Sequence, residues 1–317
     1  MFIAIVLVIM SLGVLIAGAE ILVRGAASLA KKLGISPLVI GLTVVAFGTS
    51  APELIVNMIS AFNGSADLAL GNIIGSNIAN ILLILGLSAL IYPLTVKKST
   101  AWKEIPFALL AMVLVYTMGN DVFFDGAAYN AITRTDGFSL IAMFAIFMAY
   151  TFGMEKASGE SENIKTYSWL ISSLMTGGGL ILLFIGGEVL VKNAVLLARL
   201  AGLSEAFIGL TIVAVGTSLP EMATSLVAVY HHHDDIAIGN IVGSNIFNIF
   251  WILGLTGTIL QLPFSQNINF DVSVGIFATL LLFIFMFIGS RHKIDRWQGA
   301  SFLFLYVLYI FYLINRA

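Results

Sequence analysis

The chain contains no cysteine, and only 10% of its 317 residues are charged. The missing cysteine excludes disulfide bonds, thiol catalysis and cysteine-ligated metal sites. Soluble domains carry roughly 25% charged residues, whereas this chain is 59% hydrophobic, the composition of an integral membrane protein. The formal net charge of −2 gives no reason to expect a nucleic-acid partner. Because the apolar N-terminus lacks a basic leader, we interpret it as a retained span rather than a cleaved signal.

Long apolar runs predict ten membrane-spanning helices, because one span needs about 20 apolar residues. The first and sixth are expected to extend past the membrane as amphipathic helices. The polar stretch 154–168 is the expected hinge between an N-terminal half, 1–158, and a C-terminal half, 166–317. The expected fold is an all-α membrane protein embedded in a lipid bilayer. The predicted spans are approximately 2–19, 37–61, 68–94, 105–118, 137–154, 168–190, 205–230, 236–261, 271–289 and 298–315.

The positions of lysine and arginine orient the spans, because cytoplasmic loops are enriched in both. If the N-terminus lies outside, eleven of the fifteen basic residues fall in inside loops. The four that remain outside are Arg134, Lys192, Arg199 and Arg316. Both termini are therefore predicted to lie outside the cell.

An internal repeat relates residues that lie 168 positions apart, such as Glu53 with Glu221 and Asn80 with Asn248. Roughly half the positions between residues 36 and 87 carry the same residue as their partners. The copies are five predicted spans apart, an odd number, so the second copy enters the membrane from the opposite side. Two inverted five-helix repeats are typical of secondary transporters, which bind substrate at the repeat interface near the midplane.

Each copy of the repeat carries a proline within an apolar span, in the sequences GTSAPEL and GTSLPEM. Pro52 and Pro220 have no backbone N–H to donate within a helix. We therefore expect each helix to break or kink there, freeing the carbonyls of residues 46–49 and 214–217 to face a ligand. Irregular backbone at membrane depth is tolerated where it lines a cavity or is buried in protein.

Glu53 and Glu221 follow these prolines, in the middle of spans that contain no lysine or arginine to pair with them. A carboxylate at that depth is costly unless it is paired or neutralised, so a mobile cation or a proton is the expected partner. Thr49 and Ser50 precede Glu53 by four and three residues and share its helix face. The groups nearby are carboxylates, hydroxyls, amides and carbonyls, whose oxygens suit hard cations.

The other polar groups have simpler interpretations. Glu20 and Glu188 each stand four residues before a basic residue, so salt bridges at helix ends are favoured. Asp67 and Asp235 are interpreted as N-terminal helix charges, with ion entry as the alternative. The histidines of the loop 231–233 could bind a metal, but a solvated loop is the favoured interpretation.

The motif pairs GTSAPEL with GSNIAN, and GTSLPEM with GSNIFN, resemble the α1 and α2 repeats of the calcium/cation antiporter superfamily, the sodium/calcium exchangers. The resemblance covers nearly the whole chain and is greatest to small prokaryotic members without a large regulatory loop. It implies alternating access, in which the first and sixth helices slide past the other eight. The implied function is exchange of Na⁺ for Ca²⁺ without a cofactor, and we expect a monomer that expels Ca²⁺ across the cell membrane.

The resemblance also implies which residues bind the transported ions at matching positions. Glu53 and Glu221 are the implied central ligands of both Ca²⁺ and Na⁺. The remaining implied ligands are Ser50, Ser76, Ser218 and Ser244 for Na⁺, Thr49, Thr217, Ala46 and Ala214 largely through backbone carbonyls, and Asn80 and Asn248 lining the middle.

Differences between this sequence and the motifs of related exchangers help to distinguish among the alternative functions. Potassium-dependent relatives carry aspartate at the position of Asn248, so this asparagine favours K⁺-independent exchange. Proton-coupled relatives carry a GNxxEH-type signature in place of GTSxPE, yet Ca²⁺/H⁺ or other divalent cation/H⁺ exchange stays open because glutamates can protonate. A passive cation channel is disfavoured because paired broken helices in inverted halves indicate gating. No nucleophile or cofactor motif stands beside the two acids, so we do not expect an enzyme.

Overall fold

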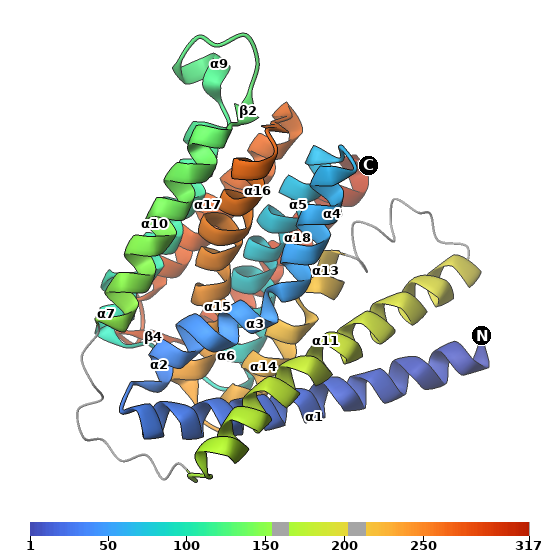
Figure 1. Ribbon diagram of the computed structural model, residues 1–317, viewed down its shortest axis with the longest axis vertical. Helices are drawn as coiled ribbons and strands as arrows, with labels where there is room; N and C mark the ends of the chain where they lie inside the picture. Colours follow the sequence, from blue (N-terminus) through green and yellow to red (C-terminus); the bar gives the residue numbers. More distant parts are fainter. Residues whose placement is uncertain (154–164, 202–213, 317) are drawn as a thin grey trace.

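A computed structural model describes residues 1–153, 165–201 and 214–316, and almost all of the regular structure is helical (Figure 1). Within these ranges eight helices are long and apolar enough to cross a membrane. The bent pair Pro37–Thr49 and Ala51–Phe62 makes a ninth if it is one span. The described part of the chain therefore has the helical architecture of a multispanning membrane protein.

The observed helices match the predicted spans to within about five residues, with three exceptions. The first and sixth are longer, as expected, and the fourth begins at Lys98 rather than at residue 105. Most of the predicted hinge at 154–168 (residues 154–164) and the start of the predicted span 205–230 (residues 205–213) lie outside the described residues. Ten spans and the boundary between the halves therefore stay predictions. The eight candidates are Phe2–Leu33, Ala66–Ile91, Lys98–Met118, Arg134–Phe152, Trp169–Leu200, Asp234–Ile259, Gln266–Phe285 and Arg296–Arg316.

The sequence repeat is also a repeat of structure, because each element from residue 46 to residue 95 recurs 168 positions later with the same bounds. The first copy comprises α3 (Ala46–Thr49), α4 (Ala51–Phe62), α5 (Ala66–Ile78), the π-helix η2 (Ala79–Leu85), α6 (Gly86–Ile91) and β1 (Leu94–Thr95). The second comprises α13 (Ala214–Thr217), α14 (Leu219–Tyr230), α15 (Asp234–Ile246), the π-helix η4 (Phe247–Leu253), α16 (Gly254–Ile259) and β3 (Leu262–Pro263).

The remaining elements surround these two copies. They are α1 (Phe2–Leu33), α2 (Pro37–Ile40), the π-helix η1 (Gly41–Val45), α7 (Lys98–Trp102), α8 (Glu104–Met118), α9 (Asp121–Phe124), β2 (Ala131–Ile132), α10 (Arg134–Phe152), α11 (Trp169–Leu200), α17 (Gln266–Phe285), β4 (Lys293–Ile294) and α18 (Arg296–Arg316).

Two short antiparallel strand pairs, β1 with β4 and β2 with β3, add to the otherwise helical fold that the sequence predicts. Each strand has only two residues, too short to show the alternation by which strands are recognised in a sequence. Each pair joins a loop of the first half to a loop of the second half. In both pairs, the predicted topology places the two loops on the same side of the membrane.

Both repeats contain the predicted helix break. Ser50 separates α3 from α4 with φ −83° and ψ 8°, and Ser218 separates α13 from α14 with φ −88° and ψ 9°. Pro52 and Pro220 lie in the first turn of the helix that follows, where a missing N–H costs nothing. The first break bends the span by 44°.

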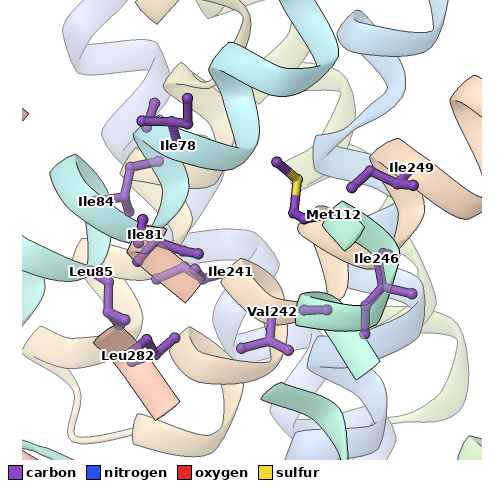
Figure 2. Packing of buried hydrophobic residues seen from close by; sticks show 14 of the residues in the cluster. Ile78, Ile81, Ile84, Leu85, Met112, Ile241, Val242, Ile246, Ile249 and Leu282 are labelled. Atoms are coloured by element: carbon purple, nitrogen blue, oxygen red, sulfur yellow. The ribbon is translucent and has the colours of Figure 1, made fainter. Parts of the chain in front are cut away.

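The centre of the molecule is formed by the spans that contain η2 and η4, of which 78% and 94% are buried. Isoleucine and leucine side chains fill the space between them, as Figure 2 shows for Ile78, Ile81 and Ile241. Met112 of α8 and Leu282 of α17 pack against the same cluster. This apolar packing encloses the polar residues of both repeats.

The long helices α1 and α11 lie side by side, oblique to the rest of the bundle (Figure 1). They are antiparallel and approach closely where both carry small residues. A Cβ atom placed on Gly179 would lie 2.6 Å from the backbone nitrogen of Leu22 and 2.8 Å from the carbonyl oxygen of Gly18. Further along, the hydroxyls of Ser28 and Ser172 are 2.8 Å apart. Glycine and serine thus allow these two backbones to touch.

Candidate cation site

Two glutamates are buried where the broken helices of the repeats meet. Glu53 lies in the first turn of α4 with 0% of its surface exposed, and Glu221 lies in the first turn of α14 with 1% exposed. The break before each helix allows a serine, Ser50 or Ser218, to stand at the turn rather than inside a helix. The prolines therefore bring two carboxylates and two hydroxyls to the centre of the bundle.

Each carboxylate accepts two serine hydroxyls, one from its own repeat and one from the other. Glu53 Oε1 lies 3.4 Å from Ser76 Oγ and 3.3 Å from Ser218 Oγ. Glu221 Oε1 lies 3.3 Å from Ser244 Oγ and 3.0 Å from Ser50 Oγ. Adding or subtracting 168 converts one set of contacts into the other. The four predicted serines are therefore all brought to the two glutamates.

The second oxygen of each carboxylate is buried without a hydrogen-bond partner, at Glu53 Oε2 and Glu221 Oε2. Within the described ranges no lysine, arginine or histidine forms an ion pair with either group. A buried charge without such compensation is strongly destabilising. Two orphaned carboxylate oxygens are a suitable donor set for a hard cation.

The predicted asparagines Asn80 and Asn248 lie beside this centre, in the π-helices η2 and η4. Asn80 Nδ2 donates to Asn245 Oδ1, and Asn248 Nδ2 donates to Asn77 Oδ1, both at 2.9 Å. The Oδ1 atoms of Asn80 and Asn248 are buried without a partner, like the glutamate Oε2 atoms. The centre thus offers four unsatisfied acceptor oxygens, two from each repeat.

The expected free carbonyls before the prolines are only partly found. The Ala46 carbonyl accepts the backbone N–H of Ser50 at 3.0 Å, and the Val215 carbonyl accepts that of Ser218 at 3.1 Å. The chain turns tightly at each serine, so an N–H after the break still reaches back to the helix. The Thr49 hydroxyl also lies 3.3 Å from the Ala46 carbonyl oxygen, so this carbonyl has contacts on both of its lone pairs.

The threonines and the second alanine stand at the ends of the short helices. Thr49 ends α3, and its hydroxyl donates to Asn240 Oδ1 at 3.0 Å. Thr217 ends α13 and Ala214 begins it. Asn240 is not among the predicted residues, although Asn240 and its equivalent Asn72 each follow a glycine in the repeated sequence GN. That repetition could have identified it.

Asn77 and Asn245 belong to the same polar helix faces as the predicted serines and asparagines but are not among the predicted ligands. The structure joins them to Asn248 and Asn80. The sequence places both next to predicted serines, within GSN in each copy. Helical spacing alone could not show which helix their side chains face, because each contacts the opposite repeat.

Outside this centre, the structure agrees with some of the interpretations of the charged residues and disagrees with others. Glu20 pairs with Arg24 as predicted, although in the interior of α1 rather than at a helix end. Glu188 is exposed and forms no described ion pair with Lys192. His231 corrects the solvated-loop interpretation, because its Nε2 is 2.6 Å from Glu20 Oε2 and its side chain is only 28% exposed. No group of three or more acidic, histidine or cysteine side chains gathers as a metal site in the part of the chain described.

The interpretation of the two helix-start aspartates is borne out by their positions. Asp67 and Asp235 lie in the first turns of α5 and α15. Asp235 also forms an ion pair with Lys97, at 2.5 Å. Neither residue contacts the buried centre in the described contacts, so both are assigned to helix ends.

The sodium/calcium exchanger protein family model matches residues 3–153 and 171–315. The chain belongs to this family. It is 31% identical to the sodium/calcium exchanger MaX1 of Methanosarcina acetivorans, over 96% of each chain. It is 37% identical to the inner membrane protein YrbG of Escherichia coli, over 89% of each chain. A solved structure of the sodium–calcium exchanger NCX_Mj, soaked with Na⁺, covers 98% of each chain with 34% identity and a TM-score of 0.84. The family is one of membrane antiporters rather than enzymes.

Proposed function

We propose that this chain exchanges Na⁺ for Ca²⁺ across the cell membrane, with Glu53 and Glu221 as the central ligands. The observation that carries the proposal is the pair of buried carboxylates whose Oε2 atoms have no partner. Four serine hydroxyls around the Oε1 atoms supply neutral oxygens that can turn toward a cation. The remaining ligands are the threonines 49 and 217, the carbonyls of residues 46 and 214, and the amide oxygens of Asn80 and Asn248.

Competition for the two carboxylates couples the two ions. One Ca²⁺ balances the two negative charges, and several Na⁺ ions can occupy the same oxygens instead. Neither set is bound in full while the other is present. A ligand shifts the equilibrium between inward-facing and outward-facing states only through differential affinity. The Na⁺ gradient then drives Ca²⁺ out of the cell.

Alternating access by two inverted five-helix repeats is supported by the reciprocal contacts at the centre. Each serine–glutamate bond has a counterpart in which the repeats exchange roles. We propose ten spans with both termini outside, in which the odd number of predicted spans between the copies inverts the second copy. The helices α1 and α11, which pack on one another beside the bundle, are the pair that slides.

Asn248 supports exchange without K⁺. An amide at this position leaves only two carboxylates among the predicted ligands, so a third negative charge that would favour an additional monovalent ion is missing. We propose a monomer as the transporting unit, because both repeats that build the site belong to one chain.

Uptake of radioactive Ca²⁺ into proteoliposomes tests this function. Uptake is expected in vesicles loaded with Na⁺ and not in vesicles loaded with K⁺, and Glu53→Gln is expected to abolish it. Uptake driven by a pH gradient alone would instead assign the chain to Ca²⁺/H⁺ exchange. Equilibration of Ca²⁺ without any counter-ion would identify a channel.

A further inference from the structure

Four asparagines, Asn77, Asn80, Asn245 and Asn248, form a cluster that joins the two repeats. Asn77 Nδ2 donates to the backbone carbonyl of Asn245 at 3.2 Å, and Asn245 Nδ2 donates to that of Asn77 at 3.4 Å. All four side chains are buried, with at most 4% exposed. The cluster is therefore closed to water and held by contacts between the halves.

The two backbone carbonyls fix the orientation of every amide in the cluster. A carbonyl can only accept, so Asn77 and Asn245 must direct their NH₂ groups toward it. The Oδ1 atom of each residue then points away from the carbonyl and can form a hydrogen bond only with a donor. Asn248 and Asn80 supply that donor through Nδ2. Their own Oδ1 atoms consequently face away from the contact and have no partner.

The unpartnered Oδ1 atoms of Asn80 and Asn248 come from residues one helical turn after the serines that contact the carboxylates. Ser76, which touches Glu53, precedes Asn80 by four residues. Ser244, which touches Glu221, precedes Asn248 by four residues. Residues with this spacing lie on one helix face. An amide rotated by half a turn would present two N–H donors there, and these would repel a cation.

We propose that Asn77 and Asn245 are positioning residues, which hold Asn248 and Asn80 with their oxygens toward the transported ion. The inference rests on the proposed function. Neither positioning residue touches the ion, and each acts on a ligand contributed by the opposite repeat. Losing partners that orient metal ligands typically lowers metal affinity about 10- to 100-fold.

The test is a double-mutant cycle on Na⁺-dependent Ca²⁺ uptake in proteoliposomes. Asn77→Ala is expected to raise the KM for Ca²⁺ about tenfold or more. If Asn77 acts through Asn248, the double variant Asn77→Ala/Asn248→Ala will have the KM of Asn248→Ala alone. Asn77→Ala/Asn80→Ala should instead show multiplied effects, because Asn80 is held by Asn245. An unchanged KM in Asn77→Ala, or multiplied effects in the Asn248 pair, overturns the inference.

A matched control separates positioning from general stability. Asn120, at the N-cap position of α9, and Asn269 of α17 form another reciprocal amide pair, at 2.7 and 2.8 Å. Asn120→Ala is expected to lower the thermal midpoint of the purified protein without changing the KM for Ca²⁺. An equal rise in KM there would attribute the effect to destabilisation and overturn the inference.

Two further measurements distinguish a failure of the positioning role from misfolding of the variant and from a failure of the proposed function. If Asn77→Ala does not fold, Asn245→Ala is measured in the same cycle with Asn80→Ala. If the wild-type chain shows no Na⁺-dependent uptake, the proposed function itself fails. Wild-type exchange with an unaffected Asn77→Ala variant would reject only the positioning role.

Discussion

At the scale of single residues, the two central glutamates are held by interactions too weak for their burial. Each has one oxygen near two serine hydroxyls and another with no partner. Hydrogen bonds from neutral hydroxyls recover only part of the hydration that a carboxylate loses in the interior. If these carboxylates bind the transported ions as proposed, the ion-free protein is expected to be less stable than the ion-bound protein.

Replacing both glutamates should stabilise the ion-free protein. Glu53→Gln/Glu221→Gln removes two uncompensated charges and keeps the side-chain volumes. In a chelator, the double variant is expected to unfold at a higher temperature than the wild type. Saturating Ca²⁺ should stabilise the wild type, by about 2.7 kcal/mol at a concentration 100 times Kd, and leave the variant unchanged.

Thermal unfolding of the detergent-solubilised protein measures both effects. Glu188→Gln is the matched control, since Glu188 is exposed on α11 and should keep the wild-type response to Ca²⁺. A double variant that melts below the wild type in chelator would show that the carboxylates are compensated.

At the scale of elements, the close packing of α1 on α11 predicts which added side-chain atoms the contact between the two helices can accommodate. Gly179→Ala places a methyl group against the backbone of α1, where nothing can move aside. Overpacking of this kind typically costs about 1–3 kcal/mol. Gly177→Ala, on the same helix with no described atom within 4 Å of the added Cβ, should be neutral or stabilising. Comparing the thermal midpoints of the two variants checks this, and equal midpoints would contradict a close contact.

The helices were largely predictable from the sequence because an apolar run long enough to span a membrane can adopt few structures other than a helix. The breaks before Pro52 and Pro220 were predictable because proline removes a specific hydrogen bond. The bond from Ser50 N–H to the Ala46 carbonyl was not, since it depends on the dihedral angles of the turn. The two-residue strands gave no periodic signal at all.

Much of the candidate site follows from the repeat, but its partner contacts do not. The positions of Glu53 and Ser76 could be read from recurring motifs. The bond from Ser218 to Glu53 required knowing which helix faces which. Asn77 shows the difference most clearly, because its neighbour in the sequence is a predicted ligand while its contacts lie in the other half.

At the scale of the whole molecule, the proposed function predicts that the carboxylates of Glu53 and Glu221 set the net charge that moves with each ion. One Ca²⁺ with Glu53 and Glu221 makes a neutral centre, and Asn80 and Asn248 add no charge. A neutral centre crosses the membrane field without electrical work. Exchange of Ca²⁺ for Ca²⁺ should therefore proceed at a rate independent of membrane potential.

The dependence of the Ca²⁺–Ca²⁺ exchange rate on membrane potential is measured by isotope exchange. Proteoliposomes contain Ca²⁺ on both sides, and K⁺ diffusion potentials of either sign are imposed. Na⁺-driven uptake in the same vesicles serves as the comparison, because a site filled by more than two Na⁺ carries a net positive charge. A marked effect of potential on Ca²⁺–Ca²⁺ exchange would mean that one glutamate is protonated or that a further charge moves.

The reciprocal serine–glutamate and asparagine contacts have a consequence for ancestry. In an isologous dimer, residue i of one subunit contacts residue j of the other, and j contacts i in return. Ser50 with Glu221 and Ser218 with Glu53 obey this rule within a single chain. Two separate half-length chains, inserted into the membrane in opposite directions, would have assembled the same cluster of oxygens. A single chain that carries both halves keeps their pairing fixed, and each half is then free to take different residues at positions outside the reciprocal contacts.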